Sequence, residues 1–320
     1  MTILITGIAG FIGNNFSMQL ADIKKDSKII GIDNVNNYYS TKIKKLRLKR
    51  LKTKKNIKFF KIDLYDEKKL SKLYKKYKFT EVYNFAAQAG VRYSLENPKA
   101  YVDSNIVGFS NLISLSKKYN INKFFFASSS SVYGDNAKFP IKENTSLNPK
   151  NPYGLSKKYN EEIAEIYYEN YNFKSTALRF FTVFGEWGRP DMFIIKYLDA
   201  AYNKKIFPLN NYGKHHRDFT YIDDVVKTIL YLRKKKSIGF EVFNISSNKP
   251  VSLFKIIHFL RNKIPLVKIK KRGMQKADIY KTHGDNRKVI KKSGFSKYTK
   301  FETALTKTHE WFKNNSKMFI

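Results

Sequence analysis

Gly7-Ile8-Ala9-Gly10-Phe11-Ile12-Gly13 is the stretch of sequence that decides the fold. It follows a short apolar strand, Ile3–Thr6, and opens a segment that we predict to be helical. Glycines at this spacing let the backbone turn tightly and approach a pyrophosphate, whose charge is favoured at a helix N-terminus. Asp33 ends the next predicted strand, 20 residues beyond Gly13. An acidic side chain there accepts hydrogen bonds from an adenosine ribose and repels a 2′-phosphate, so the stretch predicts binding of NAD rather than NADP.

Strands and helices alternate through the first 181 residues. The predicted strands are Ile3–Thr6, Lys28–Asp33, Asn56–Ile62, Glu81–Phe85, Lys123–Ala127 and Ser175–Phe181. The predicted helices are Phe11–Asp22, Lys68–Tyr77, Asn105–Tyr119 and Tyr153–Tyr171. This alternation is typical of the α/β class, and we expect a Rossmann-type doubly wound parallel sheet. Ligands of such sheets bind at the carboxyl ends of the strands.

The remainder of the chain has a less regular pattern. Glycines and prolines mark loops, and helices at Met192–Asn203, Asp223–Lys234 and Leu253–Lys263 alternate with short strands. We expect a smaller mixed α/β lobe that covers the carboxyl edge of the sheet and binds the substrate. In this division residues 1–182 form the NAD-binding domain, residues 219–235 return to it, and residues 183–320 form the lobe.

The composition limits the classes of function. The formal net charge is +36, but only 10 of the 62 basic residues are arginine, and the lysines are spread along the chain. Frequent Asn and Ile accompany them, which fits compositional drift better than a nucleic-acid-binding protein. Two basic clusters, residues 42–55 and 268–272, could still attract phosphates. The chain has no cysteine, and its five histidines show no metal-ligand spacing, so we expect no metal site.

The sequence also bears on location. The N-terminus lacks the charged lead-in of a signal peptide, and no segment reaches the roughly 20 apolar residues of a membrane span. We therefore expect a cytoplasmic protein with no membrane partner.

Tyr153 and Lys157 form a candidate acid–base pair. Residues four apart on a helix share a face, so the ammonium lies near the phenol. A nearby cation favours the phenolate, which predicts a lowered pKa for Tyr153. Such a phenol can take a proton from a substrate hydroxyl and return it. In a chain rich in lysine and tyrosine, this spacing by itself also fits a solvated helix face.

A serine run at residues 128–131 supplies a second catalytic candidate. It follows a predicted strand and precedes Tyr153 by about 24 residues. A hydroxyl at the carboxyl end of a strand can hydrogen-bond the reacting hydroxyl together with the phenol. The alternative is a flexible polar loop, which the position between the strand and Val132-Tyr133-Gly134 disfavours.

These motifs together resemble the extended branch of the short-chain dehydrogenase/reductase superfamily. The resemblance rests on Gly-x-x-Gly-x-x-Gly, Asp63-Leu64, residues 84–87, the serine run and Pro152-Tyr153-Gly154-x-Ser156-Lys157. It implies catalytic roles for Tyr153, Lys157 and Ser129, with Lys157 also hydrogen-bonding the nicotinamide ribose. It implies that NAD contacts Gly7, Gly10, Phe11, Ile12, Gly13, Asp33, Asn34, Asp63, Leu64, Phe85, Ala86, Ala87 and Lys157. Related dehydratases carry an acidic residue after the catalytic hydroxyl; Ser130 and Ser131 stand there in this chain, which disfavours dehydration.

Longer segments resemble the UDP-glucuronate 4-epimerases. They are residues 33–39, 86–98, 180–192 and 213–224. This resemblance implies an isomerase that oxidises C4 of a UDP-sugar, lets the keto sugar rotate and reduces it from the other face, with NAD regenerated in each turnover. A UDP-glucose or UDP-N-acetylhexosamine 4-epimerase and a UDP-glucuronate decarboxylase stay open. So does a non-catalytic protein that binds NAD or associates with RNA, although the intact Ser129, Tyr153 and Lys157 favour an enzyme.

The same resemblance supplies substrate contacts. Arg92, Arg189 and Thr182 match positions near the sugar and could restrain a uronate carboxylate, since arginine can make two charged hydrogen bonds to it. Arg92 and Arg189 could equally form ordinary loop ion pairs. The full set of expected substrate contacts is Arg92, Ser129, Ser130, Tyr153, Thr182, Arg189, Arg217 for the diphosphate and Asp278 for the uridine ribose. Lys276-Ala277 replaces the family's Pro-Gly before Asp278.

The resemblance finally implies a homodimer. Residues 105–119 and 153–171 match the helices that pair in family dimers. Ile163, Ile166 and Tyr167 could serve that interface or belong to the core.

Overall fold

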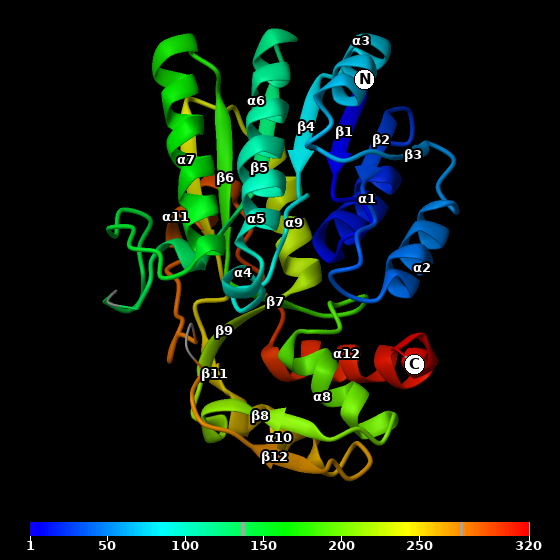
Figure 1. The fold of residues 1–320 in the computed structure, drawn as a ribbon, viewed down its shortest axis with the longest axis vertical. Helices are drawn as coiled ribbons and strands as arrows, with labels where there is room; N and C mark the ends of the chain where they lie inside the picture. Colours follow the sequence, from blue (N-terminus) through cyan, green and yellow to red (C-terminus); the bar gives the residue numbers. More distant parts are fainter. Residues whose placement is uncertain (136–137, 276–277, 320) are drawn as a thin grey trace.

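The computed structural model describes residues 1–135, 138–275 and 278–319 and contains a seven-stranded parallel sheet (Figure 1). The strand order is β10-β6-β5-β4-β1-β2-β3. The strands are β1 (Thr2–Thr6), β2 (Lys28–Asp33), β3 (Ile57–Lys61), β4 (Glu81–Asn84), β5 (Lys123–Ser129), β6 (Ser175–Phe180) and β10 (Phe240–Ile245). The order reverses between β1 and β4, which places a ligand crevice at their carboxyl ends. The expected Rossmann-type α/β class is confirmed.

Helices cover both faces of this sheet because its strands alternate their side chains between the two faces. Ile3 and Ile5 of β1 belong to a core shared with α1 (Phe11–Ile23) and α9 (Ile222–Arg233), whereas Leu4 belongs to a second core. That second core includes buried side chains of α3 (Glu67–Tyr77), α6 (Gly108–Lys118) and α7 (Pro152–Tyr171). α2 (Thr41–Leu51) follows β2 and packs beside α1.

The smaller lobe lies beyond the carboxyl ends of the strands (Figure 1). Its helices are α8 (Phe193–Tyr202), α10 (Leu253–Arg261) and α12 (Phe301–Asn315). Its strands are β7 (Thr182–Phe184), β9 (His216–Tyr221) and β11 (Pro250–Ser252) in one small sheet, and β8 (Phe207–Leu209) and β12 (Ile269–Lys271) in another. Short helices α4 (Tyr93–Glu96) and α5 (Pro98–Tyr101) follow β4, and α11 (Arg287–Ser293) packs against α9.

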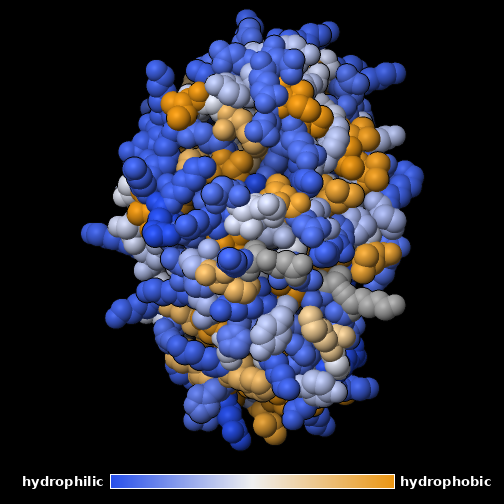
Figure 2. Space-filling model, turned by 90° about the vertical axis from the view of Figure 1, so that its left-hand side faces the viewer, coloured by the Kyte–Doolittle hydropathy of each residue, from blue (hydrophilic) through white to orange (hydrophobic). Residues whose placement is uncertain are grey.

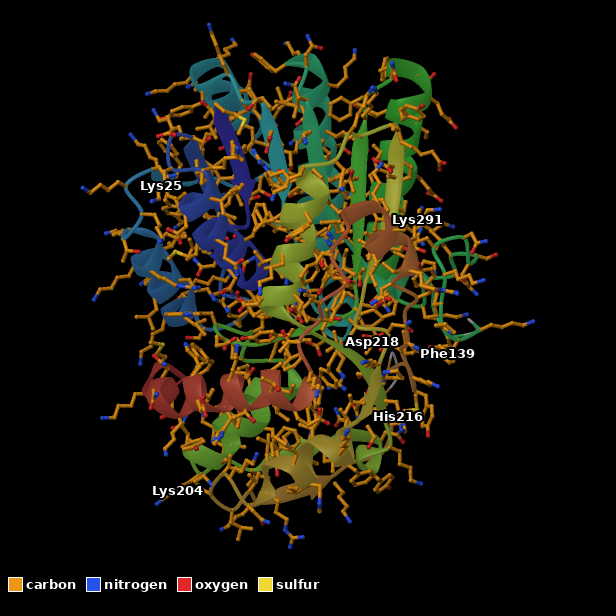
Figure 3. The ribbon with its side chains drawn as sticks, turned by 180° about the vertical axis from the view of Figure 1, so that it is seen from behind. Lys25, Phe139, Lys204, His216, Asp218 and Lys291 are labelled. Atoms are coloured by element: carbon orange, nitrogen blue, oxygen red, sulfur yellow. The ribbon has the colours of Figure 1, made fainter. Side chains whose placement is uncertain are left out.

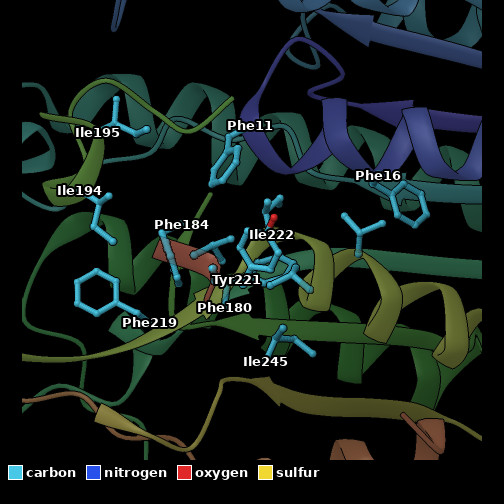
Figure 4. Close-up of a cluster of buried hydrophobic side chains, with 14 of the residues drawn as sticks. Phe11, Phe16, Phe180, Phe184, Ile194, Ile195, Phe219, Tyr221, Ile222 and Ile245 are labelled. Atoms are coloured by element: carbon cyan, nitrogen blue, oxygen red, sulfur yellow. The ribbon is translucent and has the colours of Figure 1, made fainter. Parts of the chain in front are cut away.

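One apolar cluster joins the sheet to the lobe (Figure 4). It runs from Phe16 of α1 and Ile245 of β10 to Phe219 of β9 and Ile194 of α8. Burial of such side chains stabilises the folded state by roughly 1.5–3 kcal/mol each. The cluster therefore holds the lobe against the carboxyl edge of the sheet.

Besides shifts of one or two residues at the ends of several elements, the structure differs from the sequence-based expectation in β10 and in the helix before α6, and the start of α7 has an identifiable cause. β10 lies within the range assigned to the lobe, yet it pairs with β6 as the seventh strand of the main sheet. A π-helix at Val102–Val107 precedes α6, where one continuous helix over residues 105–119 was expected. α7 begins at Pro152, because Asn151 caps it by accepting from Gly154 N at 2.8 Å. The division of the chain at residue 182 stays a prediction.

The face shown in Figure 2 is dominated by hydrophilic side chains with scattered apolar ones. Lys25, Lys204 and Lys291 are exposed and extend outward from three separate parts of the molecule (Figure 3). This dispersal agrees with the view that lysine replaces other exposed polar residues. Within the described ranges, no helix has the length and apolar character required to cross a bilayer, and no group of three or more potential ligands could hold a metal ion.

Candidate active site

A cavity of about 710 Å³ lies between the carboxyl ends of the sheet strands and the lobe. Its wall is formed by the turn after β1, the ends of β2 and β5, the loop after β4, the start of α7 and the lobe. Every residue that the sequence singled out for cofactor or substrate is in its wall: Gly7, Gly10, Phe11, Ile12, Gly13, Asp33, Asn34, Asp63, Leu64, Phe85, Ala86, Ala87, Arg92, Ser129, Ser130, Tyr153, Lys157, Thr182, Arg189, Arg217 and Asp278. The structure thus brings the predicted set together, whereas the role of each residue stays a prediction.

The glycine turn between β1 and α1 is too close to other backbone for any side chain. Gly7 has a φ of +66°, and a Cβ there would lie 2.5 Å from Ala86 N. A Cβ on Gly13 would lie 2.3 Å from Gly7 O. Gly10 precedes α1 and offers no side-chain cap, so the first amides of the helix remain available to an anion. The turn therefore fits the pyrophosphate of a dinucleotide.

Asp33 lies at the far side of this turn. Its carboxylate accepts from Ala9 N at 3.1 Å and from Val35 N at 2.7 Å. Burial raises the pKa of Asp33, and these two hydrogen bonds and the charge of Lys44 oppose the increase. The carboxylate is thus fixed beside the turn, where it can accept from a ribose hydroxyl. The Asn34 side chain donates to the Asp63 carboxylate at 2.8 Å, and this hydrogen bond links the residues after β2 to those after β3.

The catalytic candidates Ser129, Tyr153 and Lys157 line the same cavity. Burial raises the pKa of Tyr153, while a hydrogen bond with Ser129 and the charge of Arg189 oppose that increase. The pKa of Tyr153 is thus raised, where a lowered pKa was predicted, and Lys157 is not among the groups that cause the shift. The Lys157 ammonium instead donates to Ala127 O at 2.8 Å, and burial lowers its own pKa to about 8. The helix spacing gave no information on the burial of either group.

Asn105 is a supporting residue that the sequence reasoning missed. It lies in the π-helix, donates to Ser156 Oγ at 2.9 Å and to Gln88 O at 3.0 Å, and accepts from Gln88 N at 2.7 Å. Asn160 of α7 donates to the Asn105 backbone carbonyl at 2.7 Å. These bonds tie the loop after β4 to the catalytic helix. A buried polar residue inside a π-helix is a signal that only the backbone geometry reveals.

Two predicted sugar contacts form ion pairs in the cavity wall. Arg92 makes a bidentate pair with Asp278, with Nη2 at 2.8 Å from each carboxylate oxygen and Nε at 3.1 Å from Oδ1. Arg189 pairs with Asp191 at 2.5 Å, and Asp191 also accepts from the Tyr38 hydroxyl at 3.1 Å. The alternative of loop ion pairs thus describes both arginines in this structure. Both side chains nevertheless face the cavity.

Arg217 is oriented differently. Among the residues that the structure describes, its guanidinium donates only to the backbone carbonyls of His216 and Tyr280, each at 3.0 Å. Burial lowers its pKa to about 10, so the group is charged at neutral pH and has no bonded carboxylate. Of the three arginines in the described cavity wall, Arg92 and Arg189 are paired with carboxylates and Arg217 is not, which leaves Arg217 available to a phosphate. Other wall residues, to which the sequence reasoning gave no individual role, are Tyr38, Lys44, Gln88, Asp191, Lys196 and His215.

Comparisons with known proteins agree with this site. The family described as GDP-mannose 4,6-dehydratase matches residues 4–308. Protein CapI of Staphylococcus aureus is 38% identical over 98% of this chain and 98% of its own length. UDP-glucuronate 4-epimerase 4 of Arabidopsis thaliana is 38% identical over 98% of this chain and 75% of its own length. The crystal structure of UDP-glucuronic acid 4-epimerase from Bacillus cereus, in complex with UDP-glucuronic acid and NAD, superposes with a TM-score of 0.91 at 28% identity, covering 98% of this chain and 100% of that one. The 4-epimerases named above are similar to this chain over 98% of its length. The chain therefore belongs to the GDP-mannose 4,6-dehydratase family of extended short-chain dehydrogenases/reductases.

Proposed function

We propose that this protein is an NAD-dependent 4-epimerase that interconverts UDP-glucuronate and UDP-galacturonate. The observation that carries the proposal is the meeting of Ser129, Tyr153 and Lys157 with the glycine turn in a single cavity. The relatives named as UDP-glucuronate 4-epimerases, and a neighbour crystallised with UDP-glucuronic acid and NAD, support the choice of sugar and cofactor. NAD, when bound, would supply the acceptor for the C4 hydrogen and return that hydrogen to the opposite face.

The chain's own residues would handle the proton and the orientation. Tyr153 in its ionised form accepts the proton of the C4 hydroxyl and later returns it. Ser129 hydrogen-bonds the same hydroxyl and keeps the Tyr153 phenol aligned with it. Because burial raises the pKa of Tyr153, the ionised form depends on the groups that face the phenol. The Lys157 ammonium holds the end of β5 and is available to a ribose hydroxyl.

Two further requirements concern the substrate. A uronate oxidised at C4 is a β-keto acid, which loses CO₂ unless its carboxylate is held away from alignment with the ketone. Arg189 is the candidate for this restraint, because it faces the cavity and Asp191 holds its guanidinium in place. Arg217 is the candidate for the diphosphate, since it lacks a bonded carboxylate among the described residues.

The test is to incubate the purified protein with several UDP-sugars, without added nicotinamide, and to resolve the products. Formation of UDP-galacturonate from UDP-glucuronate is the expected result. Exclusive formation of a UDP-pentose would replace epimerisation by decarboxylation, and turnover of UDP-glucose alone would change the sugar. Inertness toward every UDP-sugar would refute the enzyme assignment. Tyr153→Phe should abolish turnover and leave NAD bound.

We also propose a homodimer formed through the outer face of α7. Ile163 and Tyr167 pack against the core, whereas Ile166 is exposed and lies on the same helix as exposed Leu155 and Tyr171. These apolar side chains could be covered by a second copy. Light scattering after gel filtration measures the mass, and a mass of one chain would refute the dimer. The cytoplasmic location stays a prediction.

A further inference from the structure

The catalytic groups of this protein come from two elements that must be held in register. Ser129 ends β5, whereas Tyr153 lies in the first turn of α7. About 24 residues separate them in the chain, so local geometry alone does not set their distance. Ser129 can lower the pKa of the Tyr153 phenol only while α7 and the end of β5 keep their relative position.

Two contacts, one helical turn apart, connect α7 to that end of β5. The first is the hydrogen bond from Lys157 to Ala127 O at 2.8 Å. The second comes from Glu161, whose carboxylate accepts from Ser128 Oγ at 2.5 Å. Ala127 and Ser128 are the two residues that immediately precede Ser129. The second contact has no part in the proton transfer and requires its own explanation.

Arg179 of β6 fixes Glu161. β6 pairs with β5 so that Arg179 is directly opposite Ser128. Its Nε donates to Glu161 Oε1 at 2.9 Å and its Nη2 to Oε2 at 2.6 Å. The two side chains are only 5% and 4% exposed. Arg179 Nη1 is itself held by the Tyr133 hydroxyl at 2.7 Å and by Glu143 O at 2.9 Å.

A buried ion pair is poorly explained by stability alone. Two charges lose their hydration on burial, and replacing such pairs by well-packed apolar residues is often neutral or stabilising. The pair instead fixes the orientation of the Glu161 carboxylate, because a bidentate arginine holds both of its oxygens. Neighbouring side chains on a strand point to opposite faces. Holding Ser128 toward α7 therefore sets the direction in which Ser129 points.

We propose that Glu161, held by Arg179, is a positioning residue that aligns Ser129 with Tyr153 through Ser128. The effect on turnover rests on the proposed function, whereas the effect on the phenol does not. A misaligned Ser129 would no longer oppose the raised pKa of Tyr153, and Ser129 is the first of the groups that oppose it. The phenol should then titrate at a higher pH.

The first measurement is therefore a titration that needs no substrate. The tyrosinate absorbance of each holoenzyme is followed with pH, and the curve of the same protein carrying Tyr153→Phe is subtracted. Ser128→Ala and Glu161→Gln should both move the Tyr153 transition to higher pH. Glu162→Gln is the matched control: Glu162 is the next residue of α7, its side chain is 56% exposed, and it pairs with Lys158 at 3.5 Å.

The second measurement is turnover of the UDP-sugar by the same proteins. Loss of alignment should lower kcat on the order of tenfold to a hundredfold with KM unchanged, because small misplacements of reacting groups carry such costs. Ser128→Ala removes one hydroxyl and keeps the ion pair, so it decides the matter if Glu161→Gln fails to fold.

The outcomes separate the two proposals. An inert wild type would refute the proposed function, and the titration would still test Glu161. An unchanged Tyr153 transition in Ser128→Ala and Glu161→Gln would overturn the inference. A fall in kcat without a change in the titration would do the same, since it would show a merely structural role. An equal change in Glu162→Gln would also overturn it.

Discussion

Lys157→Met should make the protein more stable near neutral pH while it removes a catalytic group. Lys157 is 2% exposed, and burial lowers its pKa from 10.5 to about 8. At about 1.4 kcal/mol per pH unit, keeping the buried ammonium charged costs roughly 3 kcal/mol of unfolding free energy. Methionine removes that cost but leaves Ala127 O without the 2.8 Å hydrogen bond, a loss of about 1–3 kcal/mol. The expected net effect at pH 7 is a gain of roughly 0–2 kcal/mol.

The dependence on pH is the sharper part of this prediction. The folded-state pKa of Lys157 lies below its unfolded value, so between about pH 8 and 10.5 the unfolded state binds more protons. Wild-type stability therefore rises over this window, relative to the variant, as the buried ammonium loses its proton. Urea unfolding of NAD-free wild type and Lys157→Met at pH 7 and at about pH 9.5 should show the difference shifting by about 2 kcal/mol in favour of wild type.

A neighbouring lysine gives the control for this experiment. Lys158 is one residue further along α7, and its pair with Glu162 at 3.5 Å is exposed. Lys158→Met should change the unfolding free energy by less than about 1 kcal/mol at either pH. A Lys157→Met difference that stays constant between the two pH values would refute the reasoning, because it would show that the folded-state pKa of Lys157 is not lowered by burial.

Two further predictions concern the cavity wall. Gly13→Ala should weaken NAD binding by at least roughly tenfold and lower the thermal midpoint, because its Cβ would lie 2.3 Å from Gly7 O and overpacking costs about 1–3 kcal/mol; calorimetric titration with NAD measures it. Gly273→Ala, whose Cβ would meet nothing within 4 Å among the described residues, should leave NAD affinity unchanged, and an equal loss there would contradict the argument. Arg92→Met should alter stability by less than about 1 kcal/mol, since the pair with Asp278 involves a guanidinium side chain that is 51% exposed. If Arg92 contacts the nucleotide sugar, KM should rise roughly tenfold or more, and an unchanged KM would remove it from the substrate contacts.

The sequence predicted the sheet well because its signals are local. Apolar runs with a glycine-rich turn between them locate β1 and β2, and a Cβ at Gly7 or Gly13 of that turn would overlap other backbone atoms. β10 was assigned to the lobe because its partner β6 lies 65 residues earlier, and pairing across such a separation leaves no local mark. Short strands such as β7 and β8, three residues each, carry too little pattern to be recognised.

The site residues were predictable for a different reason. Motifs such as Tyr153-x-x-x-Lys157 name the groups that face the cavity, but not what those groups bond to. The partners of Arg92 and Arg189 are a carboxylate 186 residues away and one only two residues away. Only the folded chain shows that both arginines are already paired. If Arg189 restrains a uronate as proposed, the substrate carboxylate has to compete with Asp191 for its guanidinium.

The sequence and the structure differ in which groups they indicate as favouring ionisation of the Tyr153 phenol. The spacing to Lys157 suggested that one ammonium activates the phenol, but that ammonium is bonded to a backbone carbonyl. The groups that favour the ionised phenol are Ser129 at the end of β5 and Arg189 in the loop after β7. The pKa of this phenol on α7 thus depends on groups from the end of β5 and the loop after β7, which meet it only in the folded protein. The loop that carries Arg189 also forms part of the cavity wall. The carboxylate of a uronate that paired with the Arg189 guanidinium would therefore weaken the positive charge that favours the ionised form of Tyr153.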